Sequence, residues 1–153
     1  DAMDVPLARA KLIARTEKMR AYRSSTLEQY RQSEVVRMWR RLASKSLRTC
    51  FACLEADGRV YSLQTEFEEH PAGRCAAVPV VLGVSAVQWK TGREWFEGLD
   101  EEKQRNIMGD GHYELWKRSG INLAKMVKRT KNPIWGASLG KKPLRDLEKE
   151  LAA

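Results

Sequence analysis

The hydrophobic and polar positions along the chain predict a helical beginning, a strand-rich middle and a helical end. From Val5 to about Gln32, apolar residues lie among Arg, Lys, Glu and Gln with no glycine, which predicts one long helix. Ser24, Ser25 and Thr26 are expected to interrupt it, because their hydroxyls compete for backbone hydrogen bonds. Thr26 equally suits the cap of a second short helix.

The middle of the chain carries β-branched and aromatic residues. Residues 35–42 alternate partly between apolar and polar side chains, which favours a strand, with a helix as the alternative. Residues 76–82 also predict a strand. Its Pro79 has no N–H to donate to a ladder, which indicates an edge strand or a strand end.

A turn dipeptide, Asp57-Gly58, lies between two further candidate strands. Residues 53–56 precede it and residues 59–63 follow it, and such a dipeptide commonly closes a hairpin. Together with the strands on either side, this hairpin predicts a small antiparallel sheet in the middle of the protein.

After Gly83 the pattern returns to helices with recognisable caps. Thr91 stands three residues before Glu94, which is the spacing of a capping box. Asp100 is expected to cap the next helix and Gly109 to end it. Further short helices are expected over residues 112–118, 122–129 and 143–151.

These elements predict an α+β fold with a long N-terminal helix, a small antiparallel sheet and short C-terminal helices. Residues 1–48 form a basic helical arm plus a strand, residues 49–82 a Cys/His loop and hairpin, and residues 83–153 a C-terminal helical extension. A chain of 153 residues suits one compact domain with a single core. Because it begins with Asp1 rather than Met, we expect a processed form or the C-terminal part of a longer protein.

The net charge of +8 is distributed unevenly. Residues 1–48 hold 12 Lys and Arg against 5 Asp and Glu, residues 49–81 hold 2 against 5, and residues 82–153 hold 14 against 10. Excess positive charge favours DNA, RNA or an acidic protein surface as a partner, and a solubilising surface is the alternative. With no apolar run near the roughly 18 residues of a membrane span, and no secretion signal, we expect no membrane partner.

Three cysteines and one of the two histidines fall within 26 residues. Their spacing is C-x2-C-x16-H-x4-C, and the residues are Cys50, Cys53, His70 and Cys75. Two thiolates in one tight turn can bind one metal ion, and the expected hairpin would bring a second pair of donors, a His and a Cys, close to them. This pattern predicts a tetrahedral zinc site. Four protein ligands leave no position for water, so this zinc would be structural. A site that has lost its metal, and simple packing of cysteines, are the alternatives.

The densest basic stretch lies near the C-terminus, bracketed by Trp116 and Trp135. Its members are Lys117, Arg118, Lys125, Lys128, Arg129 and Lys131. Basic side chains neutralise phosphates and aromatic rings stack on exposed bases, so a nucleic-acid contact face is predicted here. A solvated helix face with two core tryptophans is the alternative.

His112 and Glu114 raise the question of catalysis. A histidine and a carboxylate beside cations suit general acid–base cleavage of a phosphodiester. However, no second histidine or carboxylate cluster lies nearby in the sequence, and no Walker loop, dinucleotide fingerprint or nucleophile elbow is present. We therefore expect that the protein is not an enzyme.

A succession of short motifs spans nearly the whole chain. In order they are Ile13-Ala14-Arg15-Thr16-Glu17, a Trp-bearing strand, Arg48-Thr49-Cys50-x-x-Cys53, Asp57-Gly58, and His70-Pro71-x-x-Arg74-Cys75-x-x-x-Pro79-Val80. This succession resembles the head-morphogenesis, or minor head, protein family of Mu-like and other tailed phages. The continuation is similar to that family's C-terminal extension: Thr91-Gly92-x-x-Trp95-Phe96-x-x-Leu99, then Gln104 and Gly109.

The resemblance implies a virion protein present in few copies and needed to assemble the phage head. Its implied partners are the portal and major capsid proteins and packaged DNA, with no small-molecule substrate. Its implied location is the virion, and the host cytoplasm during assembly. The alternatives are a phosphodiester-cleaving or toxin-like phage enzyme using His112, and a zinc-stapled nucleic-acid-binding module.

One position departs from the family's usual His-Pro-Asn-Cys-Arg-Cys. This chain has Gly73 where the first of those cysteines would stand. If that position supplies the metal ligand, this chain has lost the site. If Cys75 is the ligand, the four-residue set is intact.

Overall fold

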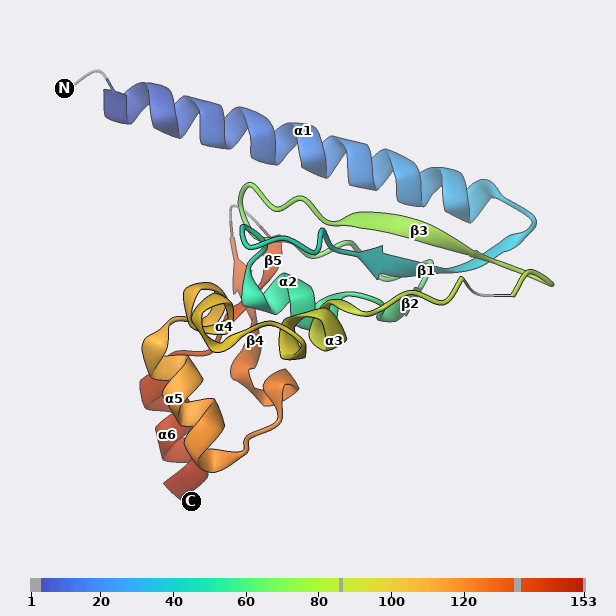
Figure 1. The fold of residues 1–153 in the computed structure, drawn as a ribbon. Helices are drawn as coiled ribbons and strands as arrows, with labels where there is room; N and C mark the ends of the chain where they lie inside the picture. The colour runs from blue at the N-terminus through green and yellow to red at the C-terminus, as the bar shows by residue number, and fades with distance from the viewer. Residues whose placement is uncertain (1–3, 86, 134–135, 153) are drawn as a thin grey trace.

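The computed structural model describes residues 4–85, 87–133 and 136–152, and its elements confirm the predicted α+β fold. The long helix α1 (Asp4–Gln32) lies along one side of the molecule, next to the sheet (Figure 1). That sheet is antiparallel, in the order β2-β1-β3, and is built from β1 (Val36–Leu42), β2 (Val60–Ser62) and β3 (Ala76–Val81). A separate antiparallel pair consists of β4 (Val127–Asn132) and β5 (Gly136–Lys141).

The remaining elements are short helices. They are α2 (Phe51–Ala56), α3 (Gly92–Glu97), α4 (Glu101–Met108), α5 (Asp110–Ser119), the 3-10 helix η1 (Leu123–Met126) and α6 (Leu144–Ala152). The predicted caps are confirmed. Thr91 Oγ1 accepts from the backbone N–H of Glu94, and the Glu94 carboxylate in turn accepts from the N–H of Thr91. Asp100 caps α4, and Gly109 ends it with a φ of 86°.

The helix α1 is continuous, so the predicted interruption at residues 24–26 is wrong. Thr26 Oγ1 donates to the carbonyl oxygen of Tyr22 (2.9 Å), one turn earlier, and this bond satisfies the hydroxyl within the helix. Residues 6–15 are exposed. Among the described residues, no helix combines the length and the apolar character that crossing a membrane requires.

The predicted strand over residues 53–56 is also wrong, because these residues belong to α2. Cys50 caps this helix, with its Sγ accepting from the N–H of Cys53 (3.4 Å). Every residue of α2 is buried, and a short, fully buried run carries no periodicity that separates a strand from a helix. Asp57-Gly58 therefore joins α2 to β2 instead of closing a hairpin.

The predicted helix over residues 122–129 is only a turn of 3-10 helix that continues into β4. Val127 to Asn132 pair with β5, in a register that joins Val127 to Lys141 and Asn132 to Gly136. The strand β5 is not predicted by the sequence pattern, because Gly136 and Gly140 both disfavour a strand. Pairing between the two segments, rather than the propensity of either, decides this hairpin.

The sheet near α1 agrees with the predictions for residues 35–42 and 76–82. The strand β3 is an edge strand, as Pro79 predicts, and Pro79 lies opposite Trp39 of the central strand. Trp39 stacks on Tyr61 and Phe67, with ring centroids 4.4 and 4.9 Å apart. The predicted C-terminal helices at residues 112–118 and 143–151 are confirmed as α5 and α6.

Two hydrophobic clusters meet at α2. The larger cluster joins α2 to the C-terminal elements, and its members are Phe51, Leu54, Phe96, Ile107, Met108, Tyr113, Leu115, Ile121, Leu123, Met126 and Leu147. The smaller cluster contains Ala43, Cys53 and Cys75, with Cys50 and Phe67 packed against it. The Cys-x-x-Cys turn thus lies at the junction between the sheet, α1 and the C-terminal core.

Candidate metal centre

The helix α2 and the loop between β2 and β3 bring the predicted donors together. Cys50 and Cys53 lie one helical turn apart, and His70 approaches both of them from the loop. Its Nε2 lies 3.2 Å from Cys50 Sγ and 3.3 Å from Cys53 Sγ. All three cysteines are free thiols, so no disulfide competes for these sulfur atoms.

Cys75 joins the cluster with a residue that sequence reasoning missed. The ligand atoms of Cys53, Cys75 and Glu69 lie within 4.8 Å of one another. All four predicted donors therefore gather at one place, together with the carboxylate of Glu69. Its position directly before His70 is the only sequence signal for it.

The donor set fits a tetrahedral metal ion. With Zn–S and Zn–N bonds of about 2.3 and 2.05 Å, neighbouring donors lie about 3.6 Å apart, slightly farther than they lie here. The His70 Nδ1–H donates to the carbonyl oxygen of Pro71 (2.9 Å), so the Nε2 that faces the sulfurs is the nitrogen left to bind metal. The residues present could thus hold zinc with small outward shifts.

Two buried arginines surround the carboxylate of Glu69. Arg41 lies 2.9 Å and Arg23 lies 3.8 Å from Glu69 Oε2, and all three side chains are at most 4% exposed. Both guanidinium groups also lie over the ring of Phe67, at 4.8 and 5.0 Å. Burial raises the pKa of Glu69, but Arg41 and His70 outweigh it and lower that pKa overall. The cluster therefore contains a carboxylate that stays ionised in a buried setting.

The chain around His70 is anchored to α1. Thr16 Oγ1 accepts from the N–H of Ala72 (3.0 Å), which has a left-handed φ of 58°. Arg23 donates to the carbonyl oxygens of Gly73 (2.7 Å) and Cys75 (2.9 Å). These bonds fix the backbone of the donor loop, and the fixed backbone orients the donor side chains.

The two thiols of the Cys-x-x-Cys turn differ in acidity. The pKa of Cys50 is lowered to about 4, because its sulfur is hydrogen-bonded by Cys53 and lies beside His70. The same hydrogen bond, with the neighbouring Cys75 and with burial, raises the pKa of Cys53. The pKa of His70 is raised to about 9, chiefly by its bond to Cys50. In the metal-free site, a thiolate therefore faces an imidazolium.

We expect iodoacetamide to alkylate Cys50 of the metal-free protein at a nearly constant rate between about pH 5 and 8, since its pKa is about 4. The substitution His70→Gln removes the imidazolium, raises the pKa of Cys50 and slows labelling several-fold at about pH 6. Mass spectrometry of each cysteine over time measures this. His112→Gln is the control, and labelling of Cys50 that follows an ordinary thiol pKa of about 8.5 would contradict the prediction.

The predicted basic residues are spread over three elements. Lys117 and Arg118 lie in the last turn of α5, Lys125 lies in η1, and Lys128, Arg129 and Lys131 lie in β4. All except Lys128 are exposed. Arg129 is paired with Glu68, and Lys128 lies 3.8 Å from Asp146, so part of this charge is neutralised internally. Trp135, predicted to bracket the stretch, lies outside the described residues.

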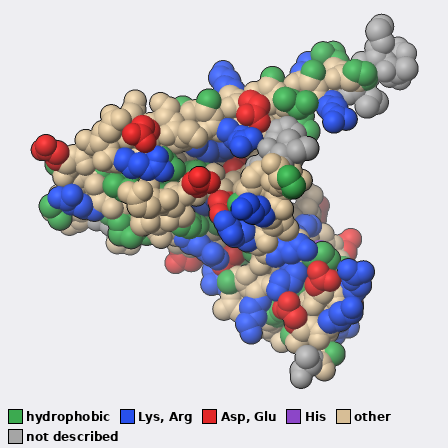
Figure 2. All heavy atoms as spheres, turned by 180° about the vertical axis from the view of Figure 1, so that it is seen from behind, with side chains coloured by type: hydrophobic (Ala, Val, Ile, Leu, Met, Phe, Trp, Pro, Cys, Tyr) green, Lys and Arg blue, Asp and Glu red, His purple; other side chains and the backbone are tan. Residues whose placement is uncertain are grey.

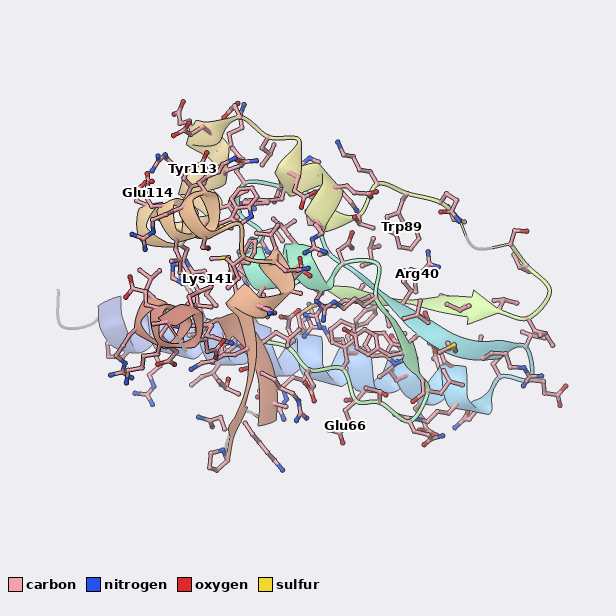
Figure 3. The ribbon with its side chains drawn as sticks, turned by 90° about the horizontal axis from the view of Figure 1, so that it is seen from below. Arg40, Glu66, Trp89, Tyr113, Glu114 and Lys141 are labelled. Carbon is pink, nitrogen blue, oxygen red and sulfur yellow. The ribbon has the colours of Figure 1, made fainter. Side chains whose placement is uncertain are left out.

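The residues of the catalytic alternative make structural contacts. His112 Nε2 donates to the carbonyl oxygen of Lys142 (2.8 Å), and Glu114 binds the guanidinium of Arg105. Glu114 lies on α5, at the end of the molecule away from Trp89 (Figure 3). These contacts tie α5 to its neighbours and do not assemble an acid–base pair.

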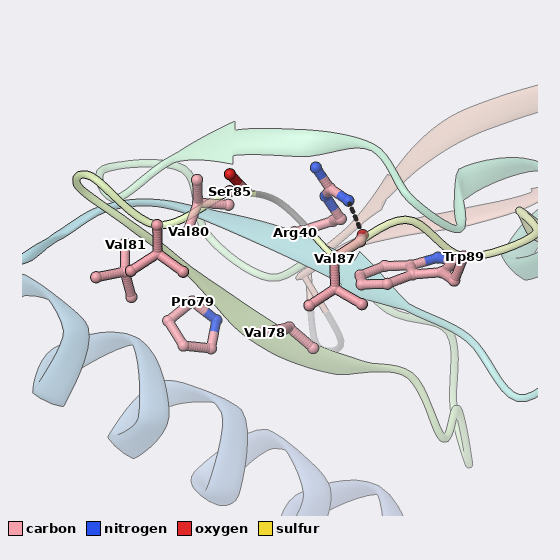
Figure 4. Close-up of a pocket in the computed structure, with 9 residues that line it drawn as sticks. Arg40, Val78, Pro79, Val80, Val81, Ser85, Val87 and Trp89 are labelled. Carbon is pink, nitrogen blue, oxygen red and sulfur yellow. Dashed lines mark hydrogen bonds between the residues drawn. The ribbon is translucent and has the colours of Figure 1, made fainter.

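A small apolar pocket lies under the chain that follows β3 (Figure 4). Arg40 Nη1 donates to the carbonyl oxygen of Val87 (3.3 Å), and its guanidinium lies 4.9 Å from the centre of the Trp89 ring. The pocket has a volume of about 90 Å³. Small-molecule sites typically measure about 300–1,000 Å³, so this pocket suits a few apolar atoms and not a whole ligand.

Comparisons of the chain with protein-family models, curated proteins and solved structures found no match.

Proposed function

We propose that this protein is a non-enzymatic minor head protein of a tailed phage, stabilised internally by a structural zinc ion. The observation that supports the proposal best is the convergence of separate motifs on one cluster. Thr16, the Cys50-x-x-Cys53 turn and the His70-to-Cys75 loop come from three parts of the chain and meet there. These are the motifs on which the resemblance to head-morphogenesis proteins rests.

A second pair of those motifs also meets in space. Asp57 of the Asp57-Gly58 turn accepts a hydrogen bond from the N–H of Gly92 (2.8 Å). A Cβ at Gly92 would lie 2.5 Å from the carbonyl oxygen of Leu54, so this contact needs glycine. The segment that carries the C-terminal motif therefore packs directly on the segment that carries the Asp57-Gly58 motif. This contact supports the interpretation that the motifs belong to one structural unit and are not chance matches.

The zinc has a structural role in this proposal. Held by protein donors alone, it has no position open for water and supplies no hydrolytic chemistry. It would join α2 to the loop between β2 and β3, which Thr16 and Arg23 bind to α1. The engagement of His112 and Glu114 in structural contacts supports the same non-enzymatic conclusion.

The proposed partners are the portal and major capsid proteins, and packaged DNA. Lys and Arg side chains gather over the lobe of C-terminal elements, with Asp and Glu among them (Figure 2). The exposed first half of α1 carries Arg9, Lys11 and Arg15. Surfaces of this charge suit acidic protein faces and phosphates, as expected for a protein located in the virion and assembled in the host cytoplasm.

The test is to locate the chain in particles. Heads made in cells that express a tagged chain should contain it at a fixed ratio to the portal and major capsid proteins, measured by quantitative mass spectrometry. His70→Gln should reduce incorporation, whereas His112→Gln should not. Absence of the chain from purified heads would contradict the proposal. Nuclease activity that His112→Gln abolishes would favour the enzyme instead.

A further inference from the structure

We propose that Glu69 is a direct ligand of the metal, in a set with Cys50, Cys53 and His70, and that Cys75 lies outside the coordination shell. This inference rests on the proposed zinc centre and names its fourth ligand. Three features of the described residues carry it: the spacing of the donors, the orientation of the carboxylate, and the space next to Gly73.

The spacing of the donors favours Glu69. Its Oε1 lies 3.4 Å from Cys53 Sγ and 3.4 Å from His70 Nε2. The same Nε2 lies 3.2 Å from Cys50 Sγ and 3.3 Å from Cys53 Sγ. The imidazole nitrogen thus has three other donors around it, all near the separation of about 3.6 Å that a tetrahedral zinc ion imposes.

The two oxygens of Glu69 have different surroundings. Oε1 faces Cys53 Sγ and the His70 imidazole and accepts from the N–H of His70 (3.1 Å). Oε2 is held by Arg41 at 2.9 Å, with Arg23 at 3.8 Å. A carboxylate that binds metal through one oxygen is typically oriented by hydrogen bonds to the other. The arginines also offset the negative charge that two thiolates and a carboxylate leave around one divalent ion.

Gly73 provides the space that this carboxylate occupies. A Cβ at position 73 would lie 2.2 Å from both Cγ and Cδ of Glu69, and 2.6 Å from Oε1. Neither group can move aside easily, because Arg23 holds the carbonyl oxygen of Gly73 and Arg41 holds the carboxylate. The side chain of Glu69 therefore takes the place that a side chain at position 73 would take.

Cys75 has the contacts of a supporting residue. Its side chain is 1% exposed and packs in the small cluster with Ala43 and Cys53. Its Sγ lies within 4.8 Å of a carboxylate oxygen of Glu69. From this position Cys75 supports the carboxylate ligand by packing and does not bind the metal itself.

The experiment is titration of the metal-free 153-residue protein with Co²⁺, followed through the sulfur-to-cobalt charge-transfer band. The intensity of this band grows with the number of Co–S bonds, so Cys75→Ser should leave it unchanged per bound ion, whereas Cys50→Ser should lower it by about half. Loss of a supporting residue typically weakens metal binding by 10–100-fold, so Glu69→Gln should weaken it by more than about 100-fold.

A double variant tests the same geometry without relying on Glu69→Gln. Glu69→Ala with Gly73→Cys puts a sulfur where the carboxylate lies, and should raise the band by about half. The inference would be overturned if the band lost about a third of its intensity in Cys75→Ser while Glu69→Gln kept its affinity for Co²⁺. That result would still support a metal centre, with Cys75 as its fourth ligand. If the wild-type protein binds neither Co²⁺ nor Zn²⁺, the zinc centre itself fails, and this inference with it.

Discussion

Removing the proposed zinc ion with a chelator is expected to lower the midpoint of thermal unfolding by about 8–16 °C. Free zinc at about 1,000 times its Kd contributes about 4 kcal/mol to the free energy of unfolding. In a chain of this size, each kcal/mol shifts the midpoint by about 2–4 °C. The physical reason is that the loop carrying His70 and Cys75 contains no helix or strand, so a metal ion bound by His70 and the cysteines of α2 would add a cross-link between this loop and α2.

The two histidines of the chain provide a matched pair for this measurement. His70→Gln should lose the zinc-dependent shift in scanning calorimetry, because its Nε2 faces both sulfurs. His112→Gln should keep the full shift, because His112 bonds to Lys142 on another part of the fold. An equal midpoint with and without chelator in the wild-type protein would contradict a structural metal.

Replacing Asp57 with Ala should lower the free energy of unfolding by about 3–5 kcal/mol. The carboxylate of Asp57 is fully buried and accepts from the N–H of Ala43 (2.6 Å) and the N–H of Gly92 (2.8 Å). It also pairs with Lys45 at 3.1 Å. The substitution leaves two buried N–H groups without acceptors, at the point where the sheet, α2 and α3 meet.

Asp100→Ala is the control for this prediction. Asp100 also accepts from a backbone N–H, that of Lys103 (2.9 Å), but it is exposed, so its loss should destabilise the protein much less than the loss of Asp57. Asp57→Asn should lie closer to Asp57→Ala than to the wild type, because its amide N–H₂ faces a second N–H donor. Urea unfolding followed by circular dichroism compares the three variants. Similar losses for Asp57→Ala and Asp100→Ala would show that the buried carboxylate has no special role.

The parts of the fold that the sequence predicts correctly depend on neighbours along the chain. The capping box of Thr91 and Glu94, and the cap at Asp100, involve residues three positions apart. The place of Pro79 on an edge strand follows from its missing N–H. Each of these features is a property of a few consecutive residues, and so it can be read without knowing the rest of the fold.

The incorrect predictions concern segments whose structure is decided by distant partners. The helix α2 is buried on every side, so it lacks the polar face that distinguishes a helix from a strand. The strand β4 forms because β5 pairs with it, although glycines weaken the strand pattern of β5. Only the tertiary structure supplies these partners.

The residues of the candidate site also fall into two groups, those that the sequence predicts and those that only the tertiary structure reveals. The sequence spacing alone predicts that Cys50, Cys53, His70 and Cys75 form one cluster, because the Cys-x-x-Cys turn and a nearby His/Cys pair are local patterns. The proposed role of Glu69 depends on Arg23, Arg41 and the space at Gly73, which come from α1, β1 and the loop. No sequence pattern relates these residues, since burial and charge pairing between distant segments exist only once the chain has folded.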